Sequence, residues 1–469
     1  MTAPVPADVI SRLKAVLGEG GWSQDPDRLA PKLVEWRDRW SGTTPLLALP
    51  RSVGDVAAVI GVCASSQVAI TPQGGNTGLV GGQIPQGEIL LSLERLRAIR
   101  AVDTEDDVLV AEAGVTLAAV HEAALQVRRR FPLSLASEGS ATIGGLVSTN
   151  AGGVAVLRYG TMRQLVLGLE VVLPNGEVWG GLKRLRKDNT GYDLKQLFIG
   201  AEGTLGVVTA AALKLFPELA SRAVAIAGVA TPRDAVALLG EAKAITGGAV
   251  ESFELICRLG MELAVRHIPG ARKPLERAPP WYVLIEIASN EAGAAEAAME
   301  RLLEAGMESG RVLDAALAQT ESQARAFWAL RENQSAAQKS EGAAWKHDIA
   351  VPVSRIADFL ETAGTELTAR YPGVRIDAFG HVGDGNIHYD VLGSPDADPA
   401  VHNGRRDEAA HLVHEIVMSF DGSISAEHGL GTMKTAEALA YKSPVEAAVQ
   451  RAIRAALDPA RIMNPRVLF

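Results

Sequence analysis

Residues 72–82 read Pro72-Gln73-Gly74-Gly75-Asn76-Thr77-Gly78-Leu79-Val80-Gly81-Gly82, with five glycines among eleven positions. Glycine adopts backbone conformations that other residues avoid, so consecutive amide N–H groups can point into one concavity. Such a concavity binds phosphate oxygens. A mobile surface loop is an equally good interpretation of this segment alone, so the decision depends on the rest of the chain.

Two further glycine-rich segments follow in the sequence. One runs Ser137-Glu138-Gly139-Ser140-Ala141-Thr142-Ile143-Gly144-Gly145 and leads to Asn150-Ala151-Gly152-Gly153 and Tyr159; the other, 199–207, reads Ile-Gly-Ala-Glu-Gly-Thr-Leu-Gly-Val. Three such segments in one predicted domain are hard to explain as surface loops. The chain lacks Gly-x-Gly-x-x-Gly between a strand and a helix, and it lacks Gly-x-x-x-x-Gly-Lys-[Ser/Thr]. These absences argue against a Rossmann dinucleotide site and a nucleoside triphosphatase.

Together the three segments closely resemble the FAD domain of the vanillyl-alcohol oxidase/p-cresol methylhydroxylase superfamily, over roughly residues 40–215. The resemblance implies an α+β fold: a two-subdomain FAD-binding domain with an inserted α+β substrate (cap) domain. It also implies that residues 72–79 wrap the FAD pyrophosphate and that the other segments line the flavin. The expected cofactor-binding residues are Pro72, Gln73, Gly74, Gly75, Asn76, Thr77, Gly78, Leu79, Ser137, Glu138, Gly139, Thr142, Ile143, Gly144, Gly145, Asn150, Ala151, Gly152, Gly153, Tyr159, Glu202, Gly203, Thr204, Gly206, Val207 and Asn464. The nearest histidine, His121, lies outside all three segments, so we expect non-covalent FAD.

Length, charge and cysteine content restrict the class of protein. A chain of 469 residues is too long for one hydrophobic core, so two or three domains are expected. A net charge of −9 argues against nucleic acid as the main partner. The two distant cysteines, Cys63 and Cys257, fit a reducing compartment. With no signal-peptide pattern and no apolar run of about 18 residues, we expect a cytoplasmic protein without a membrane span.

Local patterns predict mixed helices and strands, and so an α+β fold. Ser52 with Asp55 three residues later predicts a helix start, and Asn175-Gly176 predicts a hairpin. After Leu219 the chain becomes richer in alanine and glutamate; the amphipathic segments are 234–246, 290–306 and 317–340. We expect an FAD-binding domain over 1–217, a substrate domain over 218–423, and a segment, 424–469, that returns to the FAD domain and the active site.

Residues 379–390 contain a histidine pair. They read Phe379-Gly380-His381-Val382-Gly383-Asp384-Gly385-Asn386-Ile387-His388-Tyr389-Asp390, two strands around a predicted two-residue turn, Asp384-Gly385. His381 would then lie directly opposite His388, with Cβ atoms about 4.5–5.5 Å apart, close enough to share a metal. Glu427, in Ser425-Ala426-Glu427-His428-Gly429, is the candidate third ligand. Zinc suits this set, although iron and manganese bind similar ones, and two hydrogen-bonded structural histidines are the alternative.

The same motifs match the metal-dependent D-2-hydroxy-acid dehydrogenases of the superfamily. That resemblance favours a metal on His381, His388 and Glu427, and it implies that His428 is the catalytic base and contacts the substrate. In the expected reaction the metal lowers the pKa of the substrate hydroxyl, His428 accepts its proton, and a hydride passes to the flavin.

The choice of hydroxy acid depends on three residues, Arg331, Ser335 and Lys346. Arg331 and Ser335 share one face of a predicted helix over 321–340. Solvated surface charge is the ordinary explanation of a single arginine or lysine. In the D-2-hydroxyglutarate dehydrogenases, however, residues with this spacing bind the distal carboxylate. We therefore expect oxidation of D-2-hydroxyglutarate to 2-oxoglutarate. A D-lactate, D-malate or glycolate dehydrogenase is the alternative, and a non-catalytic flavin-binding subunit is the remote one.

Two positions depart from the family pattern. Asp390, expected among the substrate-binding residues, stands where asparagine is common, and it would repel the substrate's C1 carboxylate unless it is protonated or turned toward a cation. Arg466 stands where lysine is common. The resemblance further implies electron-transfer flavoprotein as the electron acceptor, with oxygen as an alternative, and a homodimer is the default assembly.

Overall fold

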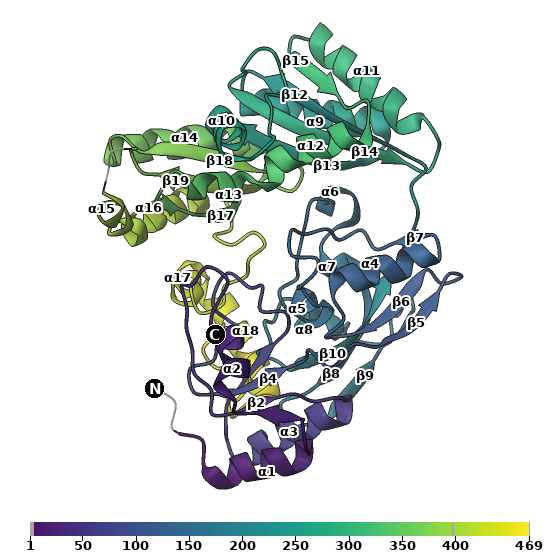
Figure 1. Cartoon of the computed structure of the whole chain (residues 1–469), viewed down its shortest axis with the longest axis vertical. Coiled ribbons are helices and arrows are strands. Elements are labelled where there is room, and N and C mark those ends of the chain that lie inside the picture. The colour runs from purple at the N-terminus through teal and green to yellow at the C-terminus, as the bar shows by residue number, and fades with distance from the viewer. Residues whose placement is uncertain (1–3, 396–397, 469) are drawn as a thin grey trace. The chain divides into compact units, whose positions relative to one another are not determined.

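The computed structural model describes residues 4–395 and 398–468, and the chain forms two compact units (Figure 1). Unit 1 comprises Met1–Gly153, Gly160–Glu218 and Glu427–Phe469, and unit 2 comprises Val154–Tyr159 and Leu219–Ala426. The predicted boundaries differ from this division in three places, the smallest being that this part of unit 1 ends at Glu218 and not at 217. The short segment Val154–Tyr159 belongs to unit 2, and the returning segment begins at Glu427, three residues after the expected 424.

Direct contacts explain why Val154–Tyr159 leaves the unit that surrounds it in sequence. Ser252 Oγ donates to the carbonyl oxygen of Val154 at 2.7 Å, and Arg158 Nη1 donates to that of Ala288 at 2.7 Å. Helix α6 (Val156–Tyr159) also packs on strand β13 (Val250–Cys257) of unit 2. These contacts join residues about one hundred positions apart, which sequence patterns do not show.

A four-stranded sheet with helices α1 (Ala7–Leu17) and α3 (Val53–Ser65) forms one half of unit 1. Its order is β1-β2-β4-β3, with bounds Trp22–Ser23, Leu47–Ala48, Ile89–Ser92 and Ile70–Gln73. Leu13, Ile60 and Leu91 are fully buried in its core. The predicted helix start is confirmed, since Ser52 Oγ accepts from the amide of Asp55 at 3.1 Å.

A five-stranded antiparallel sheet forms the other half of unit 1. Its order is β5-β6-β10-β8-β9, with bounds Ile99–Asp103, Val108–Glu112, Val207–Lys214, Val166–Val172 and Val178–Gly181. The predicted Asn175-Gly176 hairpin is confirmed: β8 pairs with β9, and Gly176 has φ +87°. The other elements of unit 1 are α2 (Pro26–Leu33), α4 (Leu117–Gln126), β7 (Arg129–Arg130), α5 (Ile143–Ser148), α7 (Met162–Leu165), α8 (Lys195–Phe198), β11 (Phe216–Pro217), α17 (Thr435–Tyr441) and α18 (Pro444–Leu457).

Unit 2 is built on one large antiparallel sheet. The strand order is β15-β12-β14-β13-β18-β19-β16, and β17 also pairs with β19. The bounds are β12 Ser221–Val229, β13 Val250–Cys257, β14 Trp281–Ser289, β15 Val312–Leu317, β16 Ala344–Trp345, β17 Asp348–Ala350, β18 Arg375–His381 and β19 Asn386–Leu392. The helices are α9 (Pro232–Thr246), α10 (Arg258–His267), α11 (Ala294–Glu308), α12 (Glu321–Glu332), α13 (Gln334–Lys339), η1 (Val353–Arg355), α14 (Ile356–Arg370), α15 (Pro399–Asn403) and α16 (Arg406–Ser419).

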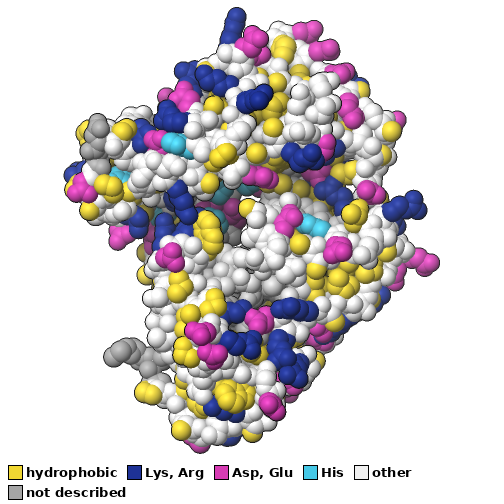
Figure 2. All heavy atoms as spheres, viewed as in Figure 1, with side chains coloured by type: hydrophobic (Ala, Val, Ile, Leu, Met, Phe, Trp, Pro, Cys, Tyr) yellow, Lys and Arg dark blue, Asp and Glu magenta, His cyan; other side chains and the backbone are white. Residues whose placement is uncertain are grey.

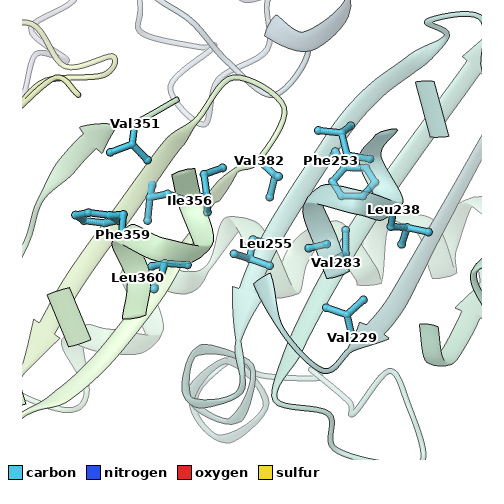
Figure 3. Packing of buried hydrophobic residues seen from close by; sticks show 14 of the residues in the cluster. Val229, Leu238, Phe253, Leu255, Val283, Val351, Ile356, Phe359, Leu360 and Val382 are labelled. Atoms are coloured by element: carbon cyan, nitrogen blue, oxygen red, sulfur yellow. The ribbon is translucent and has the colours of Figure 1, made fainter. Parts of the chain in front are cut away.

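The unit 2 sheet is covered on both faces. On one face Phe253 and Leu255 of β13 pack with Phe359 of α14 and with Val382 in a single apolar core (Figure 3). On the other face Ile256 and neighbouring residues pack against α10 and α12. Because side chains alternate along a strand, Glu254 of β13 points to this second face, between Phe253 and Leu255 of the first. The candidate site is built there.

The surface shows mixed charge. Figure 2 shows Lys and Arg side chains interspersed with Asp and Glu over the face that it presents. This face therefore offers no continuous basic surface for nucleic acid. Within the described ranges, none of the helices combines the length and apolar composition needed to cross a bilayer.

Candidate active site

Unit 1 packs the glycine-rich segments directly against each other. A Cβ at Gly75 would lie 1.8 Å from the carbonyl oxygen of Ser140, and one at Gly74 would lie 2.4 Å from Thr142 Oγ1. Gly203 has φ +73°, and its Cβ would lie 2.5 Å from Cγ of Pro72. Only glycine leaves room for these approaches, so the three segments form one structure and not three separate loops.

The first segment presents a row of amide donors. None of the described residues accepts a hydrogen bond from the backbone N–H groups of residues 75–79. The loop is nevertheless held in place. Asn76, with φ +56°, donates through Nδ2 to the carbonyl oxygens of Pro31 and Val34, and Gln83 Nε2 donates to that of Gly78. A fixed loop with five consecutive available amide donors fits a phosphate group.

Buried polar atoms beside this loop also fit a bound cofactor. In the described part of the chain, Thr142 Oγ1, Gln73 Oε1 and Asn464 Oδ1 are buried without a hydrogen-bond partner. Buried polar atoms in native proteins nearly always have a hydrogen-bond partner. These three atoms therefore indicate a bound ligand that would supply the missing hydrogen bonds. The residues present therefore fit FAD, the group that the sequence implies.

The remaining predicted flavin residues all belong to unit 1, with one exception. Ser137, Glu138 and Gly139 precede α5, which contains Ile143, Gly144 and Gly145, while Asn150 Oδ1 accepts from Thr161 Oγ1 at 2.9 Å. Asn464 Nδ2 donates to the carbonyl oxygens of Gly82 and Glu202 at 3.0 and 2.9 Å. The exception is Tyr159, which belongs to unit 2. The neighbouring unit 1 residues are Leu79, Ala151, Gly152, Gly153, Thr204, Gly206 and Val207.

The loop after Glu427 and His428 is fixed to a flavin segment within unit 1. Glu202 accepts through Oε1 from the amide of Leu430 and through Oε2 from that of Gly431, both at 2.9 Å. Burial raises the pKa of Glu202, although these two hydrogen bonds oppose the shift. Glu427 Oε1 lies 3.8 Å from His428 Nε2. The loop that directly follows the predicted base is therefore held by a residue of the third glycine-rich segment.

The histidine hairpin has a different register from the predicted one. Val382–Gly385 join the strands, so His381 pairs with Asn386, while His388 pairs with Phe379. The predicted two-residue turn was wrong because Val382 packs in the apolar core and does not pair with Ile387. The Val382 amide donates to the Phe253 carbonyl oxygen at 3.0 Å, and the Val382 side chain is fully buried (Figure 3).

The two histidines still lie on one face of the sheet. The register differs by two residues from the predicted one, and an even shift keeps each side chain on its face. The ring centroids are 6.0 Å apart, and one ring nitrogen of each histidine lies within 4.8 Å of one of the other. Such a pair can share an ion. Glu427 belongs to unit 1 and the histidines to unit 2, so its role as third ligand stays a prediction.

A buried carboxylate that sequence patterns did not reveal, Glu254, holds His381. Its Oε1 is 2.7 Å from His381 Nδ1, and its Oε2 accepts from Arg331 Nε at 2.8 Å. Burial raises the pKa of Glu254, but its interactions with His381 and Arg331 outweigh this effect, and the net shift of the pKa is downward. A carboxylate on the second ring nitrogen is typical of metal-binding histidines. The residues present therefore fit a divalent metal.

Arg331 and Ser335 do not lie on one helix as predicted. Helix α12 ends at Glu332 and α13 begins at Gln334, with Asn333 between them. Asn333 Nδ2 donates to the carbonyl oxygen of Ala329 at 2.8 Å, a local bond that competes with continuation of the helix. Arg331 stacks over Phe379, 4.9 Å from the ring centroid. It lies on the second face of the sheet, where Phe379 and His381 also point.

Lys346 is the centre of a second polar group. Its Nζ donates to Gln338 Oε1 at 2.5 Å and to Ser335 Oγ at 3.3 Å, and it lies 3.5 Å from Asp390 Oδ2. The Asp390 carboxylate is turned toward the Lys346 cation. This is one of the two arrangements, with protonation, that would prevent Asp390 from repelling the substrate's C1 carboxylate. Its partner across the strands, Asp377, is buried, and burial raises the pKa of Asp377 to about 6, with Asp390 contributing.

The missed residues share one property: each becomes part of the site only through tertiary packing. Glu254 lies 127 positions before His381, and Asp377 accepts from Gln338 Nε2 at 2.8 Å across 39 positions. Glu254 and Asp377 are charged residues in largely apolar strand sequences. That is the signal that could have singled them out, since buried charges are rare unless paired.

Comparison with known proteins places these features in a family. Residues 44–180 match the family described as "FAD binding domain", and residues 218–468 match "FAD linked oxidases, C-terminal domain". The chain is 39% identical over 463 residues to a probable mitochondrial D-2-hydroxyglutarate dehydrogenase of Oryza sativa subsp. japonica, covering 98% of this chain and 81% of the relative. It is 38% identical to the D-2-hydroxyglutarate dehydrogenase of Xanthomonas citri pv. viticola, covering 93% and 91%. It is 34% identical to a D-2-hydroxyglutarate–pyruvate transhydrogenase of Saccharomyces cerevisiae, covering 94% and 90%.

Solved structures show the same fold. Substrate-bound p-cresol methylhydroxylase has a TM-score of 0.75 at 15% identity, over 98% of this chain and 96% of that one. The 4-ethylphenol oxidase of Gulosibacter chungangensis has a TM-score of 0.75 at 18% identity, over 100% and 99%. The predicted vanillyl-alcohol oxidase type of FAD-binding fold is confirmed.

Proposed function

The chain belongs to the FAD linked oxidases and, within them, to the D-2-hydroxyglutarate dehydrogenase group, and from this premise we propose that it oxidises D-2-hydroxyglutarate to 2-oxoglutarate. The observation that carries the proposal is the position of the His381–His388 pair. It projects from the sheet face on which Arg331 also lies. A 2-hydroxy dicarboxylate needs both a metal at its hydroxyl end and a cation at its distal carboxylate.

Different residues would bind the cofactor, bind the metal ion and accept the substrate proton. Residues 72–79 would hold the pyrophosphate of a non-covalently bound FAD, and His381, His388 and Glu427 would hold a divalent ion, zinc by preference. When bound, FAD supplies the electron sink and the ion supplies a Lewis acid. His428 would accept the proton of the C2 hydroxyl at a ring nitrogen, and the C2 hydrogen would pass as hydride to the FAD held by this site.

Arg331, Ser335 and Lys346 would bind the distal carboxylate. Arg331 donates through Nε to Glu254, and none of the described residues accepts a hydrogen bond from its Nη1 or Nη2. Its planar guanidinium suits bidentate contact with a carboxylate. Asp390 partly neutralises the charge of Lys346. Lys346 should therefore attract a substrate carboxylate less strongly than an unpaired lysine would. This pairing is the observation in favour of D-lactate, the alternative substrate that has no distal carboxylate.

The proposal is tested by an anaerobic visible spectrum of the purified protein, titrated with D-2-hydroxyglutarate, L-2-hydroxyglutarate, D-lactate and D-malate. We expect D-2-hydroxyglutarate to bleach the flavin, a chelator to abolish the bleaching, and zinc or manganese to restore it. Bleaching by D-lactate or D-malate alone would move the substrate assignment. A fully flavinated, metal-loaded protein that no hydroxy acid reduces would support the non-catalytic alternative.

His428→Ala separates the base from the cofactor sites. We expect this variant to retain its flavin absorbance and its metal, since His428 is neither a flavin-segment residue nor a proposed ligand. Reduction by D-2-hydroxyglutarate should fall by about 10²- to 10⁴-fold, the usual contribution of a general base. Near-normal reduction would remove His428 from the mechanism.

The acceptor, assembly and compartment are also proposals. We infer electron-transfer flavoprotein as acceptor, with oxygen or a 2-oxo acid as alternatives; the yeast relative is named for pyruvate. A homodimer is the expected assembly. Two free, buried cysteines among the described residues fit the reducing cytoplasm, whereas the rice relative is named as mitochondrial.

A further inference from the structure

We propose that Glu254 is a positioning residue that fixes the tautomer of His381 and the orientation of Arg331 at the same time. The inference rests on the proposed metal site and deepens it. One carboxylate would thus prepare both the metal end and the distal-carboxylate end of the substrate site.

The first step is the geometry of the three side chains. Glu254 Oε1 lies 2.7 Å from His381 Nδ1, and Glu254 Oε2 lies 2.8 Å from Arg331 Nε. Glu254 and His381 are also direct partners in the β13–β18 ladder, so the backbone sets their separation. Glu254 is 1% exposed, and Arg331 and His381 are buried as well. The network has little freedom to rearrange.

The second step is the chemistry of the donors. Arginine has donors and no acceptor, so one oxygen of Glu254 must accept from Arg331. The other oxygen then requires a proton on His381 Nδ1. A neutral histidine with Nδ1 protonated carries its lone pair on Nε2, the nitrogen that can bind a metal. Glu254 therefore selects the metal-competent tautomer.

The third step concerns Arg331. Nε donates to Glu254 and the guanidinium carbon lies over the Phe379 ring, 4.9 Å from its centroid, so two contacts restrict the orientation of the group. Among the described residues, nothing accepts a hydrogen bond from its Nη1 or Nη2. Those two nitrogens are the edge that remains for a substrate carboxylate.

Glu254→Gln is the informative substitution, because glutamine keeps the shape but offers one acceptor and one donor group. Arg331 can only donate, so the glutamine carbonyl must turn to it. The glutamine NH₂ then faces His381 Nδ1, which can accept only in the Nε2–H tautomer. The metal-facing nitrogen becomes protonated, and metal binding must first reverse that tautomer.

The experiment combines a metal titration with histidine NMR on flavin-loaded, metal-stripped protein. We expect zinc affinity in Glu254→Gln to fall by about 10- to 100-fold, the usual cost of losing such a partner. The ¹⁵N signals of His381, assigned by their loss in His381→Ala, should change from the Nδ1–H to the Nε2–H pattern. The spectra are recorded well above the ordinary histidine pKa of about 6.5.

Glu286→Gln is the matched control. Glu286 is a buried glutamate on the adjacent strand β14; it accepts from Arg222 Nε at 2.7 Å and from Trp328 Nε1 at 2.7 Å. It should change neither the zinc affinity nor the His381 signals. An equal loss of zinc affinity in this control would show a general effect of removing a buried charge and would overturn the proposal.

Two further outcomes decide the question. Unchanged zinc affinity and an unchanged tautomer in Glu254→Gln would overturn the role of Glu254 while leaving the proposed function intact. Failure of the wild-type protein to bind zinc or manganese would instead defeat the metal site itself. If Glu254→Gln does not fold, the wild-type spectrum alone decides: an Nε2–H tautomer of His381 would overturn the proposal.

Discussion

At the scale of single residues, the cations of the candidate site each have a buried carboxylate partner. Arg331 is paired with Glu254, and Lys346 lies 3.5 Å from Asp390 Oδ2. The sequence pattern identified both cations by their spacing and singled out Asp390 as a carboxylate that could turn toward a cation, but it did not identify Glu254. Spacing along a chain predicts which residues share an element, but the carboxylates come from other strands.

Lys346→Ala should raise KM for D-2-hydroxyglutarate by about 10- to 100-fold, because a charge-assisted hydrogen bond contributes about 1.5–3 kcal/mol. D-Lactate, which has no distal carboxylate, should be affected much less. Steady-state kinetics with both substrates measures the difference. The variant also leaves buried Asp390 without Lys346, so Lys346→Ala/Asp390→Asn is the control; equal losses on both substrates in that control would contradict the assignment.

Asp377 should make stability depend on pH. Burial raises the pKa of Asp377 from 3.8 to about 6, so the folded state binds this proton more tightly than the unfolded state. The stability contributed by the protonated group is full below about pH 4 and is lost as the pH rises through about 6. A difference of about 2 pKa units corresponds to roughly 2–3 kcal/mol.

Asp377→Asn removes this proton equilibrium while preserving the shape. In thermal unfolding of the flavin-loaded protein, the variant should match the wild type near pH 4 and should be the more stable of the two at pH 7. The substituted amide is not expected to disturb Gln338, whose Nε2 can still donate to the amide oxygen. Unfolding temperatures that stay parallel from pH 4 to 7 would show that Asp377 is ionised throughout.

At the scale of elements, patterns with a local cause were predicted well and those with a tertiary cause were not. The Ser52 helix start and the Asn175-Gly176 hairpin depend on neighbouring residues, and both are present. The Asp384-Gly385 turn failed because Val382 bonds to β13, a strand more than one hundred residues away. The helix over 321–340 is divided because Asn333 bonds locally to Ala329.

The close contact between the first two glycine-rich segments can be tested at Gly75. Gly75→Ala should lose FAD, because the added Cβ would lie 1.8 Å from the Ser140 carbonyl oxygen and must push the segments apart. The ratio of flavin to protein absorbance after purification measures the loss. Gly61→Ala is the control, since a Cβ there meets nothing within 4 Å, and it should retain a full complement of flavin. A fully flavinated Gly75→Ala would contradict the packing.

At the scale of the whole molecule, the chain passes between its two units four times, after Gly153, Tyr159, Glu218 and Ala426. Sequence patterns indicated the change of character near Leu219 and the return near the C-terminus. They did not indicate the short excursion of Val154–Tyr159, because six residues carry too little periodicity to assign to either unit.

The C-terminal segment of unit 1 packs against the glycine-rich segments, and Asn464 hydrogen-bonds to two of them. Its Nδ2 donates to the carbonyl oxygens of Gly82 and Glu202, and its amide donates to that of Ile70 at 2.8 Å. Asn464→Ala should weaken FAD binding by about 10-fold or more and increase flavin loss on dilution, measured by fluorescence. Arg461→Ala, an exposed neighbour, should bind FAD normally; equal behaviour of the two variants would contradict the role of Asn464.

The packing of this C-terminal segment has a consequence for the order of synthesis. Apart from Val154–Tyr159, unit 2 is one continuous stretch, and all of its residues have been translated before Glu427. The ribosome adds Met463, which pairs with Ile70, and Asn464, which binds the first and third glycine-rich segments, only after all of unit 2 has been made. The nascent protein can therefore finish unit 2 while unit 1 is still incomplete. The site that fits FAD is complete only after Asn464 has been added, so a chain that stops before this residue would lack the contacts that join the first and third glycine-rich segments.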